Sequence, residues 1–160
     1  MQQNIADIQA KAPECTNCAI AKGTIKPKEG SIFTSKHFEA HQDQEIPLHG
    51  FIILQSKRHI KAVDELSPDE RKEFADILPK LRNAMRNLIG VSTAYIFQEE
   101  DSPHFNAAIF PIEEWMIQKY GKKIQNVRLV MEYARNKLKT PENEKKIEES
   151  IQKLKAYFKW

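Results

Sequence analysis

Two short segments carry the side chains best suited to chemistry, and the first is a pair of cysteines. Cys15 and Cys18 form a Cys-x-x-Cys motif and are the only two cysteines among 160 residues. Two thiols at this spacing are typical of a metal-binding turn or a redox pair, and they can also be incidental. A secreted disulfide framework would need more cysteines. A thioredoxin-like redox role is disfavoured, because no βαβ pattern follows the motif.

The second segment is Ser102–Pro111, within which residues 104–110 are predicted to form a β-strand. Side chains two residues apart in a strand point to the same face of the sheet. One face of this strand therefore carries His104, Asn106 and Ala108, whereas the opposite face is apolar. The apolar face can pack against a core, and the other face can hold a polar site.

Three further β-type runs are expected to form a sheet with this strand, at residues 31–34, 50–55 and 93–98. The first two runs are separated by a segment that contains Pro47, and we expect them to be neighbouring antiparallel strands. The strands at 93–98 and 104–110 are expected to lie in the centre of the sheet.

Helical spacing of apolar residues predicts three helices, which makes the class α+β. The first helix begins at Ser67-Pro68-Asp69-Glu70, which combines an N-cap, a proline and a capping-box glutamate, and it ends at Gly90. Pro79 is expected to kink or split it. The second helix has apolar residues at Ile124, Val127, Met131, Ala134 and Leu138. The third begins at Thr140-Pro141 and has an apolar stripe at Ile147, Ile151, Leu154 and Phe158.

Length and composition predict one compact domain, with 41% hydrophobic and 29% charged residues. We interpret residues 1–139 as the domain and 140–160 as a C-terminal helical appendage whose stripe packs on its own domain. The net charge of +3 is spread without a basic block and does not favour nucleic acid. No stretch approaches the roughly 18 apolar residues of a membrane span. The N-terminus resembles no secretory leader, which favours a cytoplasmic location.

Several segments together resemble the histidine triad (HIT) superfamily of nucleotidyl hydrolases and transferases. They are the strand with His104 and Asn106, the helix at 67–90, the Phe110-Pro111…Trp115-Met116 segment, and the stretch Pro47-Leu-His-Gly-Phe-Ile-Ile-Leu-Gln-Ser-Lys-Arg-His-Ile60. The resemblance covers about residues 15–135. It implies a HIT-like α+β fold, in which an antiparallel sheet of about five strands packs with a main helix, followed by C-terminal helices.

Within the superfamily, the pattern is similar to galactose-1-phosphate uridylyltransferases and to bacterial HIT-like proteins related to diadenosine-polyphosphate hydrolases. The resemblance implies that position 106 is the nucleophile position, where a histidine would attack phosphorus. Asn106 cannot do this, because an amide lacks the nucleophilic lone pair of imidazole. We therefore expect little or no nucleotidyl transfer by this chain, whereas nucleotide binding could survive.

The resemblance also implies a structural zinc ion bound by Cys15, Cys18, His59 and His104. Zinc prefers four nitrogen or sulfur ligands in a tetrahedron, and this set has the right number and types. The alternative is a reduced thiol pair that is packed in a loop without a metal.

The nucleotide contacts implied by the resemblance are weaker hypotheses. Asp43 could bind ribose hydroxyls, with His41 as a rival, and Gln98 and Ser102 could bind phosphate oxygens. The base pocket could be walled by Ile32, Phe33 and Phe38. Each of these residues could instead belong to the core or to a turn. Trp115 and Met116 could close over the ligand or simply pack. The acidic trio Glu99–Asp101 is interpreted as a solvated turn.

The expected ligand is a nucleotide or dinucleoside polyphosphate, and relatives imply a homodimer. Two alternatives from another functional class stay open. One is a non-catalytic module that senses a nucleotide or binds a partner through its C-terminal helices. The other is a zinc-stabilised interaction domain, which would bind no nucleotide.

Overall fold

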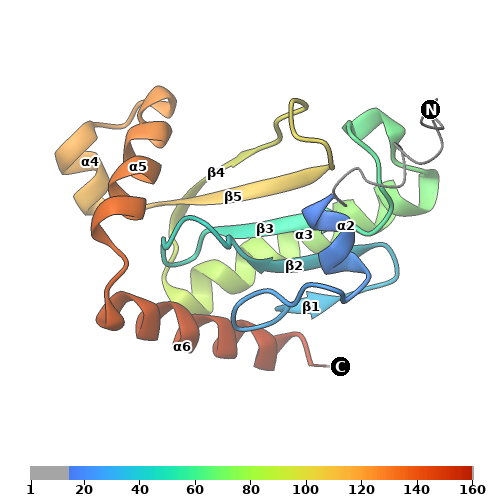
Figure 1. Cartoon of the computed structure of the whole chain (residues 1–160), viewed down its shortest axis with the longest axis horizontal. Coiled ribbons are helices and arrows are strands. Elements are labelled where there is room, and N and C mark those ends of the chain that lie inside the picture. The colour runs from blue at the N-terminus through green and yellow to red at the C-terminus, as the bar shows by residue number, and fades with distance from the viewer. Residues whose placement is uncertain (1–14, 160) are drawn as a thin grey trace, which may run out of the picture.

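The fold is centred on a five-stranded antiparallel sheet (Figure 1), and the computed structural model describes residues 15–159. The N-terminal residues on which the prediction of localisation depended lie outside that range. The strands lie in the order β1 (Phe33–Thr34), β2 (Phe38–Gln42), β3 (Ile52–Ser56), β5 (Asn106–Ile112) and β4 (Thr93–Phe97). The predicted α+β class and the predicted sheet of about five strands are confirmed.

The sheet differs from the prediction in two ways, and the first is strand β2, which was not predicted. It lies between β1 and β3, so the runs at 31–34 and 50–55 are not neighbours. All five residues of β2 are buried, although three of them are polar: Glu39, His41 and Gln42. The alternation of apolar and polar residues in this strand is short, from Phe38 to His41, and ends at the polar Gln42. The second difference concerns the two strands that were predicted to lie in the centre of the sheet. Strand β5 is internal, but β4 forms the edge of the sheet.

Helix α3 (Pro68–Ile89) follows its sequence signals closely. The Ser67 side chain accepts a hydrogen bond from the Glu70 amide, and the Glu70 carboxylate accepts one from the Ser67 amide, which completes a capping box. Gly90 ends the helix with a left-handed backbone at φ 73°. The helix is not split at Pro79.

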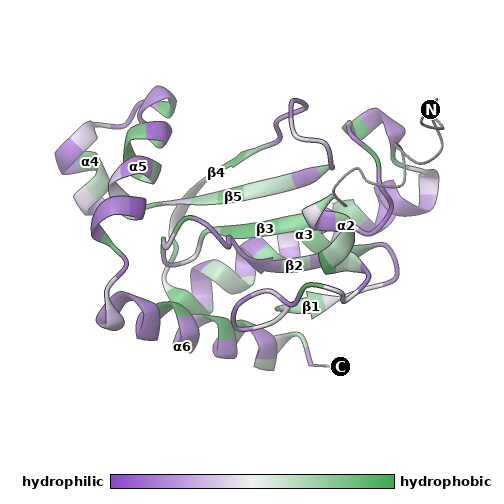
Figure 2. Cartoon of the chain, in the orientation of Figure 1, coloured by the Kyte–Doolittle hydropathy of each residue, from purple (hydrophilic) through white to green (hydrophobic). Residues whose placement is uncertain are grey.

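Two apolar clusters cover opposite faces of the sheet. On one face, Leu81 and Met85 of α3 pack with Ile52 and Leu54 of β3. Helix α6 (Pro141–Tyr157) belongs to this same cluster through Ile147, Ile151, Leu154 and Phe158. Figure 2 shows the mainly hydrophobic β3 and β5 and the alternating hydropathy of α6. The last helix therefore packs on its own chain, while the boundary between residues 139 and 140 stays a prediction.

The other face carries the second cluster, built on α4 (Glu114–Tyr120) and α5 (Val127–Lys137). Helix α4 was not predicted; Met116 is buried in this cluster, and the Trp115 ring lies 5.5 Å from that of Tyr133. Both residues therefore serve packing. A short helix, η2 (Ile124–Asn126), leads into α5, and its Ile124 is 58% exposed, although helical periodicity had predicted it as buried.

Two short elements complete the described chain, α2 (Thr16–Ala21) and η1 (Val63–Glu65). In Figure 1, α4 and α5 lie at one end of the sheet, α2 lies towards the other end, and α6 runs along the bottom. Among residues 15–159, no helix has both the length and the apolar character that a membrane span requires.

Candidate functional site

Four potential metal ligands from three separate segments meet beside one end of β5. Cys15 and Cys18 lie at the start of α2, His59 follows β3, and His104 immediately precedes β5. Their ligand atoms all lie within 4.8 Å of one another. Cys18 Sγ is 3.0 Å from His59 Nδ1 and 3.5 Å from His104 Nδ1, and Cys15 Sγ is also 3.5 Å from His104 Nδ1.

These separations suit one tetrahedral ion. Zinc bonds of about 2.3 Å to sulfur and about 2.0 Å to nitrogen place neighbouring ligand atoms roughly 3.5 Å apart. The local structure explains the arrangement of the thiols. Cys15 is the N-cap residue of α2 and Cys18 lies three positions later, so both occupy one face of a helix that is anchored by buried Ala19 and Ile20.

His104 is fixed in the orientation that a metal ligand requires. It is fully buried, and its Nε2 lies 2.7 Å from the Ser56 carbonyl oxygen. A carbonyl can only accept a hydrogen bond, so Nε2 carries the hydrogen and Nδ1 presents its lone pair to the thiols. Burial lowers the pKa of His104 and the nearby His59 acts in the same direction, while the Ser56 carbonyl opposes them. The neutral imidazole is the form that binds metals.

An open cavity of about 390 Å³ lies beside this cluster, on the face of the sheet opposite α3. Its floor includes His41 of β2, Ile53 of β3, and Asn106 and Ala108 of β5. The Asn106 amide donates a hydrogen bond to the carbonyl of His104 at 3.2 Å, which joins the floor to the backbone of a cluster residue. The cluster and the cavity are therefore parts of one site.

Strand β5 begins at Asn106 and not at His104 as predicted. Beyond Asn106 its two faces divide between the apolar clusters, with Ala107 and Ile109 in one and Ala108 and Phe110 in the other. The face with the site is therefore polar only at the beginning of the strand.

Two of the predicted nucleotide contacts line this cavity, namely Asp43 and Ser102. Asp43 accepts hydrogen bonds from the amides of Glu45 and Ile46 at 2.9 Å and 2.7 Å. Burial raises the pKa of its carboxyl, although these two amides and His41 act in the opposite direction. Ser102 donates to the His104 carbonyl at 3.1 Å.

Four other predicted contacts lie elsewhere. Gln98 donates to the Lys61 carbonyl at 3.1 Å and does not line the cavity. Phe38 and Ile32 are buried in the apolar cluster between the sheet and α3. The Phe33 ring lies 4.7 Å from the Phe158 ring of the same cluster.

The walls contain residues that the sequence did not indicate as part of a site. Asn17 and Ile20 come from α2, and Arg128, Met131 and Arg135 come from α5. The last three occupy positions i, i+3 and i+7 of one helix, which place them on one face. This spacing predicts that the three side chains share one face of the helix. The sequence does not indicate which part of the molecule that face packs against.

Comparisons with known proteins bear on the fold of the chain. No family model matches the chain, and no curated protein matches its sequence. Solved structures do match, however.

A Zn-bound histidine triad family protein from Mycobacterium smegmatis has a TM-score of 0.62 and 16% identity, over 90% of this chain and 95% of that one. A hypothetical histidine triad nucleotide-binding protein from Sulfolobus tokodaii has a TM-score of 0.56 and 17% identity, over 91% and 99%. A member of the HIT family from Bacillus subtilis has a TM-score of 0.55 and 18% identity, over 80% and 99%. The chain therefore has the histidine triad fold, as the sequence resemblance implied.

Proposed function

We propose that the chain is a nucleotide-binding protein of the HIT superfamily, in which Asn106 occupies the position of the nucleophile. The observation that carries the proposal is the location of Asn106 on the floor of the cavity, two residues from His104 of the metal-type cluster. The Sulfolobus structure with the same fold is described as nucleotide-binding, which supports this ligand class. Asp43 and Ser102 are the proposed ribose and phosphate contacts.

Zinc is the proposed metal, held by Cys15, Cys18, His59 and His104. Bound there, it would supply a structural cross-link between α2 and the sheet. The donor set, the separations and the fixed orientation of His104 support it, as does the zinc found in the Mycobacterium structure. Elemental analysis of protein purified without chelators should give about one zinc per chain, because one tetrahedral site is available. The signal should disappear when Cys15 and Cys18 are both changed to serine.

The second part of the proposal is that binding survives without turnover. In an active form, a histidine nitrogen at position 106 would form a bond to phosphorus while the bond from phosphorus to the leaving oxygen breaks. The asparagine amide lacks that nucleophile but keeps hydrogen-bonding groups of similar size. With Asn106, the site is suited to binding or sensing a nucleotide without turnover. This is the non-catalytic alternative to a nucleotidyl hydrolase or transferase.

A paired experiment tests both parts. AMP and diadenosine polyphosphates are titrated by calorimetry, and their hydrolysis is assayed, for the protein and for Asn106→His. We expect binding by both proteins and turnover only by the variant. Equal turnover by both would refute the assignment of position 106. No nucleotide binding by either would refute the ligand class and leave a zinc-stabilised interaction domain as the function.

The homodimer implied by HIT relatives is also proposed. The edge strand β4 supports it, because this strand has no partner on its outer side in the described chain and exposes Ile96 by 48%. Sedimentation analysis of the protein and of Ile96→Lys would show a dimer that the substitution converts to a monomer. A monomer in both cases contradicts the proposal.

A further inference from the structure

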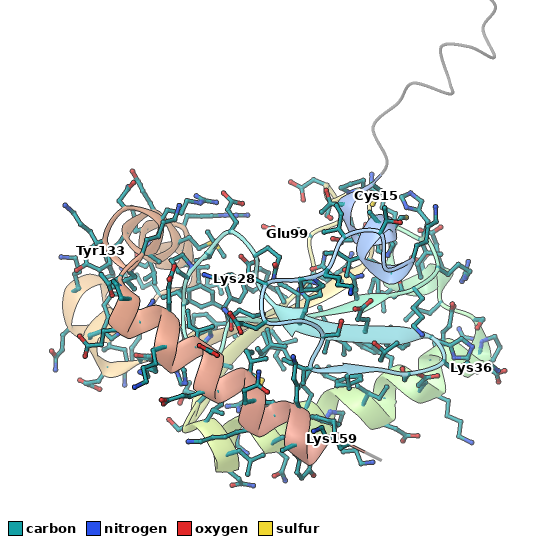
Figure 3. The ribbon with its side chains drawn as sticks, turned by 60° about the horizontal axis from the view of Figure 1, so that its bottom comes forward. Cys15, Lys28, Lys36, Glu99, Tyr133 and Lys159 are labelled. Atoms are coloured by element: carbon teal, nitrogen blue, oxygen red, sulfur yellow. The ribbon has the colours of Figure 1, made fainter. Side chains whose placement is uncertain are left out.

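A second cavity lies at the end of the sheet opposite the cysteine and histidine cluster, and it takes no part in the function proposed above. It has a volume of about 690 Å³ and is bordered by the C-terminal end of α3, the start of β4, the start of α4 and one face of α6. We call it the α6 cavity. Figure 3 brings α6 to the front of the molecule, where it runs towards the labelled Lys159.

Three polar side chains from three separate segments meet in the wall of the α6 cavity. Ser150 lies in the middle of α6, His49 precedes β3, and Glu113 follows β5. The Ser150 hydroxyl oxygen is 2.7 Å from His49 Nε2, and the Glu113 carboxylate is 3.6 Å from His49 Nδ1. Serine, histidine and carboxylate therefore follow one another in the order found in the triad of serine hydrolases.

The Glu113 carboxylate determines which nitrogen of His49 carries the hydrogen. Although burial raises the pKa of this carboxyl, His49, Lys146 and Trp115 hold it below the ordinary value, so the group is ionised and can only accept. A neutral His49 therefore places its hydrogen on Nδ1 and accepts the Ser150 hydroxyl at Nε2. A separation of 3.6 Å is longer than a hydrogen bond, but catalytic contacts of this kind are often long until a substrate binds.

The hydroxyl and the imidazole both border open space, although little of either residue is exposed. Ser150 is 6% exposed and His49 is 8% exposed, and both line the cavity. A serine hydroxyl in the middle of a helix commonly bonds to a carbonyl of the preceding turn, whereas here it lies beside a histidine nitrogen. This hydrogen bond would stabilise the fold without any adjoining cavity. The open space is what allows a substrate carbonyl to reach the hydroxyl.

The rest of the lining suits a small uncharged ester. Its charged side chains are balanced, with three lysines and three glutamates: Lys122, Lys146, Lys153, Glu113, Glu114 and Glu149. Apolar surface that can accept an acyl chain comes from Ile89, Val91, Ile112 and Ile117. Lys146 and Lys153 lie on the same face of α6 as Ser150, at i−4 and i+3. They bring positive charge to the side of the helix where the carbonyl oxygen would become negative.

We propose that Ser150, His49 and Glu113 form a second catalytic site, which hydrolyses small uncharged carboxylic esters. Ser150 Oγ bonds to the carbonyl carbon of the ester while its proton passes to His49 Nε2. The bond from that carbon to the alcohol oxygen then breaks, and the alcohol leaves with the proton. Water repeats both steps on the acyl-serine and releases the carboxylic acid. Glu113 is a positioning residue, because it acts through His49.

A fluorophosphonate probe tests the nucleophile in the full chain. Ser150 Oγ displaces fluoride from phosphorus while His49 takes the hydroxyl proton, so the label stays on the serine. After digestion with trypsin, mass spectrometry should find the label on the peptide 147–153, in which Ser150 is the only residue with a hydroxyl group. Protein unfolded in urea should not be labelled, because the histidine no longer lies beside the serine. Absence of label on this peptide in the folded protein, or equal labelling of the unfolded protein, would refute the site.

Substitutions separate the roles of the three residues. Ser150→Ala should lose both the labelling and the hydrolysis of p-nitrophenyl acetate. General acid–base catalysis contributes roughly 10²–10⁴-fold, so His49→Gln should slow labelling by about 100-fold or more. Glu113→Gln should lower kcat for the ester by about tenfold or more and leave KM unchanged, since Glu113 orients the base, and Glu113→Asp should restore part of the rate. Ser92→Ala is the matched control, because Ser92 is an exposed serine that lines the same cavity.

Two results would overturn the triad even if Ser150 carries the label. Labelling of His49→Gln at the unsubstituted rate would show that the imidazole is not the base. Hydrolysis by Ser150→Ala at the unsubstituted rate would place the esterase activity elsewhere. Circular dichroism of each variant identifies a loss of fold, and the position of the label on the unsubstituted protein depends on no variant. Neither assay involves a nucleotide, so failure of this proposal and failure of the proposed function are separate outcomes.

Discussion

His104 uses both of its ring nitrogens, whereas His59 is an exposed residue that contacts a thiol through Nδ1. The Ser56 carbonyl holds His104 Nε2, and this leaves Nδ1 for the cysteines. His59 Nδ1 lies 3.0 Å from Cys18 Sγ. The ligand set could be predicted from resemblance because it depends on residue types. The role of Ser56 could not, because its contribution comes from a backbone carbonyl that any residue would have.

His104 is buried and His59 is exposed, so we expect their substitutions to have different effects on the free energy of unfolding of the metal-free protein. Both His104→Ala and His59→Ala should weaken zinc binding, by about 100-fold or more, because each removes a ligand. In the presence of a chelator, His104→Ala should still lower the free energy of unfolding by about 2–4 kcal/mol, because it leaves a buried cavity. His59→Ala should change it by less than about 0.5 kcal/mol.

Competition with a chromophoric chelator measures the zinc affinity, and urea unfolding with and without the chelator measures stability. Equal destabilisation by the two variants in the chelator would contradict the structural difference between the histidines. Unchanged zinc affinity in either variant would remove that histidine from the ligand set.

Glu70 predicts how stability depends on pH. Its buried carboxylate accepts two hydrogen bonds from Arg58, at 2.7 Å and 3.0 Å, and one from the Ser67 amide. These contacts lower its pKa from 4.5 to about 2, with the hydrogen bond from Arg58 as the largest cause. The stabilisation is therefore complete above the ordinary pKa of a glutamate and is lost as the pH falls from there towards about 2.

Glu70→Gln should lower the free energy of unfolding by about 1–3 kcal/mol at pH 7, since it removes the charged acceptor of a buried hydrogen bond. Its effect should shrink as the pH is lowered through the range between the two pKa values. Urea unfolding at several pH values checks this, with Glu132→Gln, an exposed glutamate on α5, as the control. A loss that is the same at every pH would show that the carboxylate charge is not responsible.

At the scale of elements, Gly50 fixes how β3 enters the sheet. Its backbone has φ 76°, and a Cβ placed there would lie 2.6 Å from Val91 Cγ2, just after the end of α3. Gly90 has a similar φ of 73°, but a Cβ at this position would meet nothing within 4 Å. The pair therefore separates the cost of a left-handed backbone from the cost of a steric conflict.

Gly90→Ala should lower the free energy of unfolding by about 1–2 kcal/mol, the cost of the left-handed conformation. Gly50→Ala should cost a further 1–3 kcal/mol or so, because Val91 must move in a packed core. Chemical denaturation measures both. Equal costs would mean that the neighbouring valine moves freely, and a lower cost for Gly50→Ala would contradict the close approach.

Elements with local signals were predicted well, and elements without them were not. Helix α3 has a capping box, a proline at its first position and a terminal glycine, and its bounds agree with these signals. Strand β2 has none of them, and the burial of its three polar residues, of which only His41 lines the cavity, depends on neighbouring segments. The start of β5 was predicted two residues early, because the pairing of this strand with β3 begins only at Asn106, opposite Gln55.

At the scale of the whole molecule, the candidate site combines side chains from α2, the sheet and α5. Resemblance pointed to the cluster, which the structure assembles, and to Asn106, Asp43 and Ser102, which line the cavity while their roles stay predictions. It could not identify Arg128 or Arg135, because the side of the molecule that α5 covers is set by packing of the second cluster. Phe33 and Phe38 show the converse error: aromatic residues near the site in sequence can face the other side of the sheet.

Helix α6 is tied to the rest of the molecule by a polar network as well as by its apolar stripe. His49, which precedes β3, has its Nε2 2.7 Å from Ser150 Oγ of α6 and its Nδ1 3.6 Å from the Glu113 carboxylate. Burial works against ionisation of Glu113, but His49, Lys146 and Trp115 outweigh it and hold its pKa below the ordinary value. The network joins α6 to β3 and to the start of α4.

These contacts predict that α6 unfolds together with the sheet. Leu154 is fully buried in the cluster shared with α3, so Leu154→Ala should lower the free energy of unfolding by about 2–4 kcal/mol through a single transition. Glu148→Ala, an exposed change on the same helix, should have an effect below about 0.5 kcal/mol. Urea unfolding followed by far-ultraviolet and near-ultraviolet circular dichroism distinguishes the cases. If residues 140–160 were a separable appendage, Leu154→Ala would produce an early helical transition and leave the main one in place. Coincident curves, shifted together to lower urea, would instead place α6 within the cooperative unit that carries the site.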